Sequence, residues 1–181
     1  MKKDSLVQFI GFITALEQDD FTANWELFAG RFIRSDVKTT LQRNASPKAR
    51  YKYISWHEGV QEDLPAFTKK KRSENFPEHM VKLVEFGSYI AEQPHQQKAP
   101  KGSKRVFAFV GEESNDADFY TQPGLQQSVN VYQAYYQSCT YASVYEYWVA
   151  AENCDALVQH LKTRHGNEVA SYVDCPVPVV A

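Results

Sequence analysis

The sequence lacks any apolar run that approaches the ~18 consecutive apolar residues of a membrane-spanning helix. Its basic start, Met1 to Lys3, is followed by an apolar stretch that Gln8 and Gly11 interrupt. No small-residue cleavage site follows this stretch, so it does not have the pattern of a secretory signal peptide. We therefore expect a soluble, cytoplasmic protein that does not interact with a membrane.

Cysteine is scarce, and the three cysteines are Cys139, Cys154 and Cys175. An odd number without metal-type spacing argues against a disulfide framework and against a cysteine metal centre. The five histidines form no H-E-x-x-H or similar pair of ligands, and the sequence predicts no metal site. Cys139, near a predicted strand end, would act as a nucleophile only with a base beside it.

An excess of basic residues is also absent, because the formal net charge is -2. Nucleic-acid-binding domains carry a basic footprint, and we expect no nucleic-acid partner. The eight glycines are scattered along the chain, so no glycine-rich phosphate loop is present.

Aromatic residues, in contrast, are abundant at 14% of the chain, within a normal globular hydrophobic content of 43%. Short segments rich in β-branched and aromatic residues predict strands. In the first part of the chain these predicted strands are 6–16, 37–44, 50–58 and 81–92, the last bent at Gly87. Predicted helices cover 20–34, where aromatic residues recur at helical spacing, and the short segment 74–80.

The segment 93–104 lacks apolar periodicity and contains two prolines and a glycine, which is typical of a linker. We place a first half at 1–95, a linker at 96–104 and a second half at 105–181. The second half has predicted strands at 105–110, 129–137, 141–150 and 168–173. Strands 129–137 and 141–150 should form a hairpin. A helix is predicted at 153–166, with Cys154, Leu157, Val158 and Leu161 buried, and a short one at 116–121.

Each half therefore predicts the order strand, helix, strand, strand, helix, strand. This α+β order, with the aromatic strands 50–58 and 129–150, resembles the dimeric α+β barrel superfamily of ferredoxin-like proteins. The resemblance implies two ferredoxin-like βαββαβ halves in tandem that form a pseudo-dimeric barrel. A chain that contains both halves would be a monomer, or a homodimer if it pairs again. Members of the superfamily include small-molecule monooxygenases and haem-binding enzymes, so the fold alone does not define a reaction.

Tyrosine and histidine on the predicted strands are the candidate site residues. Tyrosine packs as a hydrophobe but needs a partner for its hydroxyl, which suits a cavity for an amphipathic ligand. His57 is the candidate catalytic base. The predicted ligand-binding residues are Tyr53, His57, Tyr132, Tyr136 and Tyr145.

Three functions remain open at this point. The first is binding or oxidation of a small aromatic or hydrophobic molecule in a barrel cavity, without a cofactor. The second is haem binding with His57 or His79 as the axial ligand, as the resemblance allows. The third is a non-catalytic interaction or oligomerisation module, in which a tyrosine-rich face contacts another chain.

Overall fold

A computed structural model of the chain describes residues 5–30, 37–46, 49–60, 80–93, 95, 98–111, 127–165 and 169–174. Of residues 26–30, 164, 165, 169–171 and 174 only the backbone is described. Apart from Met80, the predicted short helices at 74–80 and 116–121 lie outside the described residues, as does the haem-ligand candidate His79.

The described residues form a strand at each of the eight predicted positions. The strands are β1 (Ser5–Thr14), β2 (Lys38–Asn44), β3 (Tyr53–Val60), β4 (Val81–Ala91), β5 (Ser103–Val110), β6 (Ser128–Ala134), β7 (Ser143–Ala150) and β8 (Val169–Asp174). The helices are α1 (Gln18–Gly30), the 3-10 turn η1 (Ala151–Asn153) and α4 (Cys154–His165). The α+β class is confirmed. None of the helices in the described part of the chain is long and apolar enough to cross a membrane.

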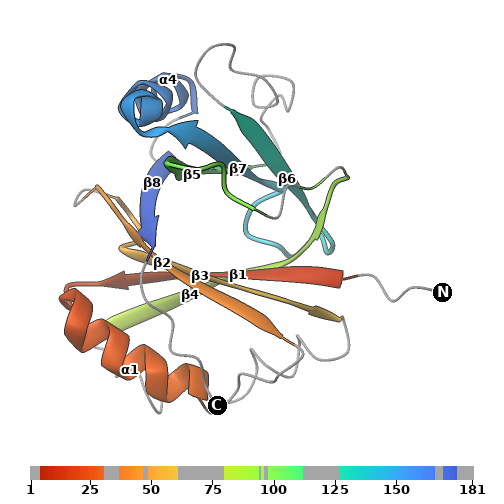
Figure 1. Cartoon of the computed structure of the whole chain (residues 1–181). Coiled ribbons are helices and arrows are strands. Elements are labelled where there is room, and N and C mark those ends of the chain that lie inside the picture. Colours follow the sequence, from red (N-terminus) through yellow and green to blue (C-terminus); the bar gives the residue numbers. More distant parts are fainter. Residues whose placement is uncertain are drawn as a thin grey trace.

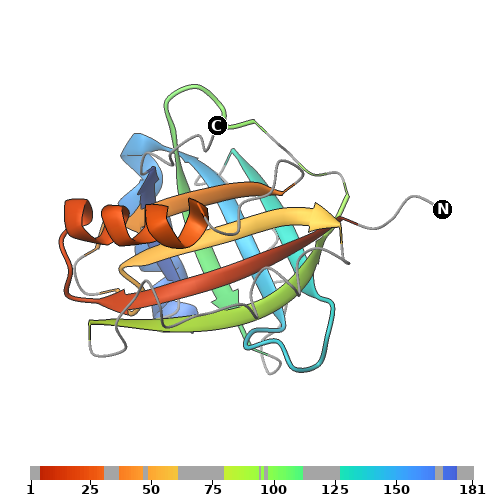
Figure 2. The ribbon, with the colours of Figure 1, turned by 90° about the horizontal axis from the view of Figure 1, so that it is seen from below.

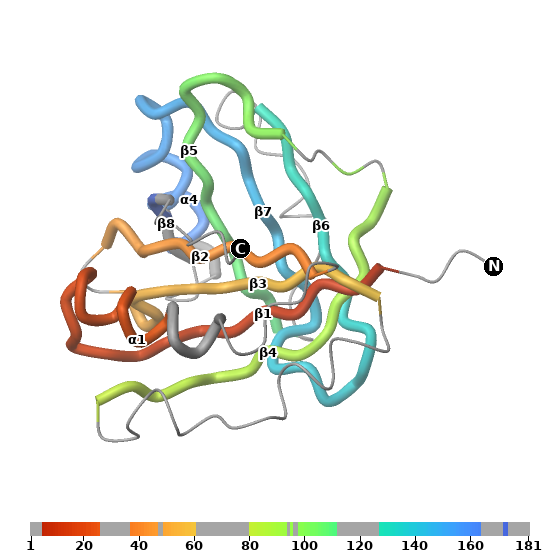
Figure 3. Tube along the Cα trace, turned by 60° about the horizontal axis from the view of Figure 1, so that its bottom comes forward, coloured from red at the N-terminus to blue at the C-terminus, as the bar shows by residue number. Residues whose placement is uncertain are grey.

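The strands close into one antiparallel barrel in the order β1-β3-β2-β8-β5-β7-β6-β4. The first four strands lie side by side as β4-β1-β3-β2, and the last four repeat this arrangement as β8-β5-β7-β6. Two pairings, β2 with β8 and β4 with β6, join the groups. Figure 1 shows the groups facing each other, and Figure 3 follows the chain around them.

Because side chains alternate across a strand, each strand of the barrel has an inner and an outer face. The inner faces form one aromatic core, in which Phe9 contacts Phe107 and Tyr132 at ring-centroid distances of 6.2 and 5.2 Å. The core also contains Trp56, Phe86, Tyr89, Phe109, Tyr141 and Tyr172. Aromatic side chains thus fill much of the interior that the described residues enclose.

Each helix covers the outer face of one group of strands. Helix α1 packs Phe21 and Trp25 against Phe12 and Tyr53 of the first group, and Figure 2 shows it lying over these strands. Helix α4 packs on the second group, and its predicted buried stripe is confirmed, because Cys154, Leu157 and Leu161 are at most 2% exposed and Val158 packs beside them. The burial of apolar side chains between each helix and its group of strands therefore holds the helix and the sheet together.

The hairpin of β6 and β7 is confirmed, but its turn is wider than predicted, since the strands end at Ala134 and Ser143. The predicted bend at Gly87 is also confirmed. Gly87 has φ 114°, and the pairing with β1 shifts register there. A Cβ at this position would lie 2.6 Å from Cys139 Sγ, so only glycine allows the 135–142 turn to pack this closely.

Candidate functional site

One end of the barrel interior contains a buried ion pair. Arg105 on β5 places Nε 2.5 Å from Oε1 of Glu146 on β7, with the side chains 16% and 5% exposed. The second carboxylate oxygen accepts hydrogen bonds from Asn130 Nδ2 at 3.0 Å and from the Tyr132 hydroxyl at 2.7 Å. A buried carboxylate needs hydrogen bonds or an opposite charge to compensate for lost hydration. Arg105, Asn130 and Tyr132 provide both.

Two tryptophans position the guanidinium of this pair. The Arg105 Cζ atom lies 4.1 Å from the ring centroid of Trp148 and 4.8 Å from that of Trp56. Aromatic faces attract a guanidinium and are its preferred stacking partners. The pair is therefore held both by hydrogen bonds to the carboxylate and by ring contacts to the cation.

A small cavity of about 30 Å³ adjoins the ion pair, with Arg105, Tyr132, Glu146, Glu58 and His95 among its lining residues. This volume is enough for a water molecule. A larger pocket of about 330 Å³ opens at the same end of the barrel. Glu58 and His95 line both spaces, so the pocket adjoins the buried polar cluster.

The walls of the larger pocket combine apolar and polar side chains. They are Ser5, Val7, Glu58, Ile90, Ala91, Gln93 and His95. The His95 ring packs edge-on against Tyr132 with a centroid distance of 5.4 Å. Its Nδ1 atom is buried and finds no hydrogen-bond partner among the described residues. The sequence suggested only a linker here, and the contact with Tyr132 is what brings His95 into the site.

Of the predicted ligand-binding residues, Tyr132 lies in this site. It is 2% exposed. Burial, and then the negative charge of Glu146, raise the pKa of the Tyr132 phenol well above its usual value. A phenol held neutral in this way donates a hydrogen bond to the carboxylate, and it is a poor base.

Tyr53 and His57 lie on the opposite, outer face of β3. Tyr53 stacks on Phe21 of α1 with ring centroids 3.8 Å apart. His57 is fully buried, and its ring nitrogens lie 3.0 Å from Thr39 Oγ1 and 3.2 Å from Ser55 Oγ. Burial lowers the pKa of His57 to about 3, so the imidazole is neutral at physiological pH.

The remaining two predicted residues lie elsewhere. Tyr145 is on the outer face of β7 in the cluster beneath α4. Tyr136 is 44% exposed in the 135–142 turn, where it contacts Tyr135 at 4.7 Å. The structure therefore does not gather the five residues into one cavity of the described region.

The resemblance to the barrel superfamily implied haem as one cofactor class, with His57 as a candidate ligand. The structure does not fit that role, because both imidazole nitrogens of His57 contact hydroxyl groups and the side chain is fully buried. In the part of the chain that the structure describes, no three His, Cys, Asp or Glu side chains come together as a metal site.

Sequence reasoning missed Arg105, Asn130 and Glu146 as site residues. A signal was present, because Glu146 interrupts the apolar alternation of β7 and shares its face with Trp148 rather than with the tyrosines. The sequence left open which face of this strand meets the second sheet, and the structure shows that the Glu146 face points into the barrel. The cross-strand pair of Asn130 with Glu146 depends on the register of the hairpin, which the tertiary structure decides.

The barrel order and the two helix-covered groups of strands define the class: the chain has the ferredoxin-like dimeric α+β barrel fold. The chlorite dismutase-like protein TA0507 aligns with TM-score 0.59 and 10% identity over 95% of this chain and 96% of that protein. A mutant chlorite dismutase from Candidatus Nitrospira defluvii aligns with TM-score 0.52 and 8% identity over 96% and 93%. A second mutant of that enzyme, in complex with cyanide, gives TM-score 0.50 and 9% identity over 96% and 92%.

No protein-family model matches the sequence, and no curated protein matches it. The structural alignments therefore confirm the resemblance to the barrel superfamily at the level of fold. At identities this low, they do not transfer a reaction or a ligand.

Proposed function

We propose that the chain binds a small, largely apolar molecule with a neutral or cationic polar head, in the pocket at the polar end of the barrel. The observation that supports this is the buried His95 Nδ1, which has no hydrogen-bond partner among the described residues, in the wall of a 330 Å³ pocket. A volume of this size lies within the range of small-molecule sites.

The lining residues suggest how such a molecule would lie. Val7 and Ala91 supply an apolar wall, against which a ring or alkyl group buries surface. Glu58 accepts a hydrogen bond from a hydroxyl or amine, and His95 supplies a ring nitrogen as a second partner. The Glu58 carboxylate favours a cationic or neutral head over an anionic one.

Binding is better supported than oxidation. His57, the predicted base, lies on the outer face of β3 and does not line the pocket. The Tyr132 hydroxyl already donates to Glu146, and its raised pKa opposes ionisation. His95 is the imidazole among the described residues that line this pocket, and it is the residue whose substitution should affect any turnover.

The test is an NMR titration of the labelled full-length chain with benzylamine, benzyl alcohol and benzoate. We expect benzylamine and benzyl alcohol to shift the signals of His95 and Ala91, and benzoate to shift them least. Ala91→Trp should fill the pocket and remove these shifts. A matched control is Ala49→Trp, since Ala49 and Ala91 are both partly buried against the same core but Ala49 lines a different pocket.

The proposal fails if no probe shifts His95, or if Ala91→Trp and Ala49→Trp leave the titration equally unchanged. His95→Ala provides a second measurement that does not depend on adding bulk to the wall. It should weaken benzyl alcohol binding while the circular dichroism spectrum stays that of the wild-type chain.

We also propose that the barrel consists of two ferredoxin-like halves, 1–95 and 105–181, joined by the linker 96–104. The repeated strand order and the reciprocal pairings β2 with β8 and β4 with β6 support this. Since both groups close within one chain, we propose a monomer, with a homodimer as the alternative. The exposed Tyr135 and Tyr136 favour the alternative, and light scattering after size exclusion distinguishes the two.

A further inference from the structure

A second pocket, of about 490 Å³, lies at the end of the barrel where β1 finishes. Ser5, which lines the first pocket, begins β1, whereas Thr14, which lines the second, ends it. The pockets therefore lie near opposite ends of this strand. The second pocket has no role in the proposed function.

The charge of this pocket is its distinctive property. Its lining includes Arg43, Arg50 and Lys52, whereas Glu17 is its carboxylate. The chain as a whole has a net charge of -2, so this concentration of cations runs against the overall balance. Positive charge gathered in a concave surface attracts anions.

The Glu17 carboxylate compensates the Lys52 ammonium group weakly. Its side chain is 87% exposed and lies 3.4 Å from Lys52 Nζ, and solvent screens such surface pairs strongly. Arg43 is half-buried on β2, and its guanidinium has no hydrogen bond or ion pair with the described residues. A partly buried guanidinium that no described anion compensates is the part of this pocket best suited to hold a ligand.

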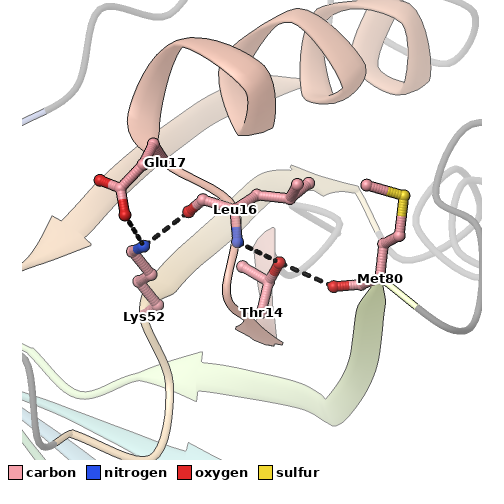
Figure 4. A network of polar contacts seen from close by, with 5 residues as sticks. All are labelled: Thr14, Leu16, Glu17, Lys52 and Met80. Atoms are coloured by element: carbon pink, nitrogen blue, oxygen red, sulfur yellow. Dashed lines mark hydrogen bonds and ion pairs between the residues drawn. The ribbon is translucent and has the colours of Figure 1, made fainter.

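The cation positions are fixed by the surrounding structure. Lys52 Nζ donates to the Leu16 carbonyl at 2.6 Å and reaches Glu17 at the start of α1, as Figure 4 shows. In the same view, Thr14 Oγ1 accepts from Leu16 N and donates to the Met80 carbonyl. These bonds hold the β1–α1 connection in place, so Lys52 presents a positioned ammonium group.

On the other side of the pocket, the described residues of the β2–β3 connection, 45–46 and 49–52, also make hydrogen bonds. Asn44 Oδ1 accepts from Ser46 N at 2.9 Å, and Asn44 Nδ2 donates to the Tyr51 carbonyl at 3.2 Å. The Arg50 guanidinium lies 5.3 Å from the centre of the Tyr51 ring. A rim held in this way loses little conformational freedom when a ligand binds.

Apolar side chains form the rest of the wall, among them Ile13, Ala15, Ala45 and Ala49. We propose that this pocket binds a small organic anion. A carboxylate or phosphate head would contact Arg43 and Lys52, where a guanidinium can bind both oxygens of the head at once. The apolar body of the anion would cover Ile13 and Ala49.

The test is isothermal titration of the full-length chain with phenyl phosphate, benzoate and benzyl alcohol, supported by NMR shift mapping. The two anions should bind at least about tenfold more tightly than benzyl alcohol at this pocket, because a charge-assisted hydrogen bond contributes that much. Their affinity should fall as sodium chloride is raised. Phenyl phosphate and benzoate distinguish a phosphate from a carboxylate ligand.

Three variants make the test specific. Arg43→Gln should weaken anion binding about tenfold or more, and Ala49→Trp should abolish it, whereas Ala91→Trp in the other pocket should leave it unchanged. Equal affinity of phenyl phosphate and benzyl alcohol for this pocket, as followed by the NMR shifts of its lining residues, would overturn the proposal. So would an unchanged affinity in Arg43→Gln, which also decides the matter if Ala49→Trp fails to fold.

Discussion

Two buried titratable side chains, His57 and Glu146, avoid an uncompensated buried charge in opposite ways. His57 lies on the outer face of β3, in the first group of strands, and Glu146 lies on the inner face of β7, in the second. His57 is neutral and contacts two hydroxyl groups, whereas Glu146 is paired with Arg105. Burial can thus be tolerated by removing a charge or by compensating it.

The difference between the two surroundings indicates where a ligand-binding site can form. The His57 centre is closed, since the ring is 0% exposed and both of its nitrogens have contacts. The Glu146 centre borders a cavity and, beyond it, a pocket. A charged pair with partial access to solvent is the more suitable neighbour for a ligand. Substitutions at His57 and at Glu146 should therefore change the free energy of unfolding in different ways.

The largest effect should come from removing the carboxylate. Glu146→Gln leaves the Arg105 guanidinium buried without its anion, and we expect a loss of about 3 kcal/mol in the free energy of unfolding. Urea denaturation monitored by tryptophan fluorescence measures this. Glu58→Gln is the control, because the ion pair of Glu58 with Lys38 is 3.8 Å long and more exposed, and its loss should cost less than about 1 kcal/mol.

Equal losses in Glu146→Gln and Glu58→Gln would contradict this prediction. Replacing both members of the buried pair, in Arg105→Leu with Glu146→Leu, should restore part of the stability that Glu146→Gln loses, since no unpaired charge remains.

The next effect depends on pH and concerns His57. Its pKa is lowered to about 3 in the folded chain, against about 6.5 when unfolded. Between these values the unfolded chain binds a proton that the folded chain does not, so stability falls as pH falls below about 6.5. By pH 5 this group alone should reduce the free energy of unfolding by about 2 kcal/mol.

His57→Gln isolates this contribution, because glutamine keeps a donor and an acceptor but does not titrate. Unfolding free energies of both chains at pH 7 and pH 5 give the comparison. The wild-type chain should lose about 2 kcal/mol more than the variant over this interval. Parallel losses in the two chains would show that the folded chain protonates His57 as readily as the unfolded chain does.

The smallest of these effects should come from Tyr132→Phe. This change removes one hydrogen bond to the Glu146 carboxylate but leaves Asn130 and Arg105 in place, so we expect a loss of about 1.5 kcal/mol. Asn130→Ala should act on the same oxygen. A double-mutant cycle with Glu146→Gln then tests whether the phenol acts through the carboxylate, and additive losses would exclude that coupling.

Much of the fold could be predicted because its strands and helices follow from local sequence patterns. Aromatic and β-branched runs located the strands, and the spacing of Cys154, Leu157 and Leu161 located the buried stripe of α4. The candidate site was less accessible to prediction. His95 lies in the segment 93–104, which has no apolar periodicity, and the contact of Arg105 with Glu146 depends on the pairing of β5 with β7.

By itself, the sequence determined which side chains share a face, because strand side chains alternate with a period of two residues. It separated Tyr145 from Glu146 on β7 in this way. Only the tertiary structure decided which face points inward, since that depends on how the barrel closes and where α1 and α4 pack. For that reason Glu146 and Tyr132 lie in the polar end of the barrel, whereas Tyr53, His57 and Tyr145 lie outside it.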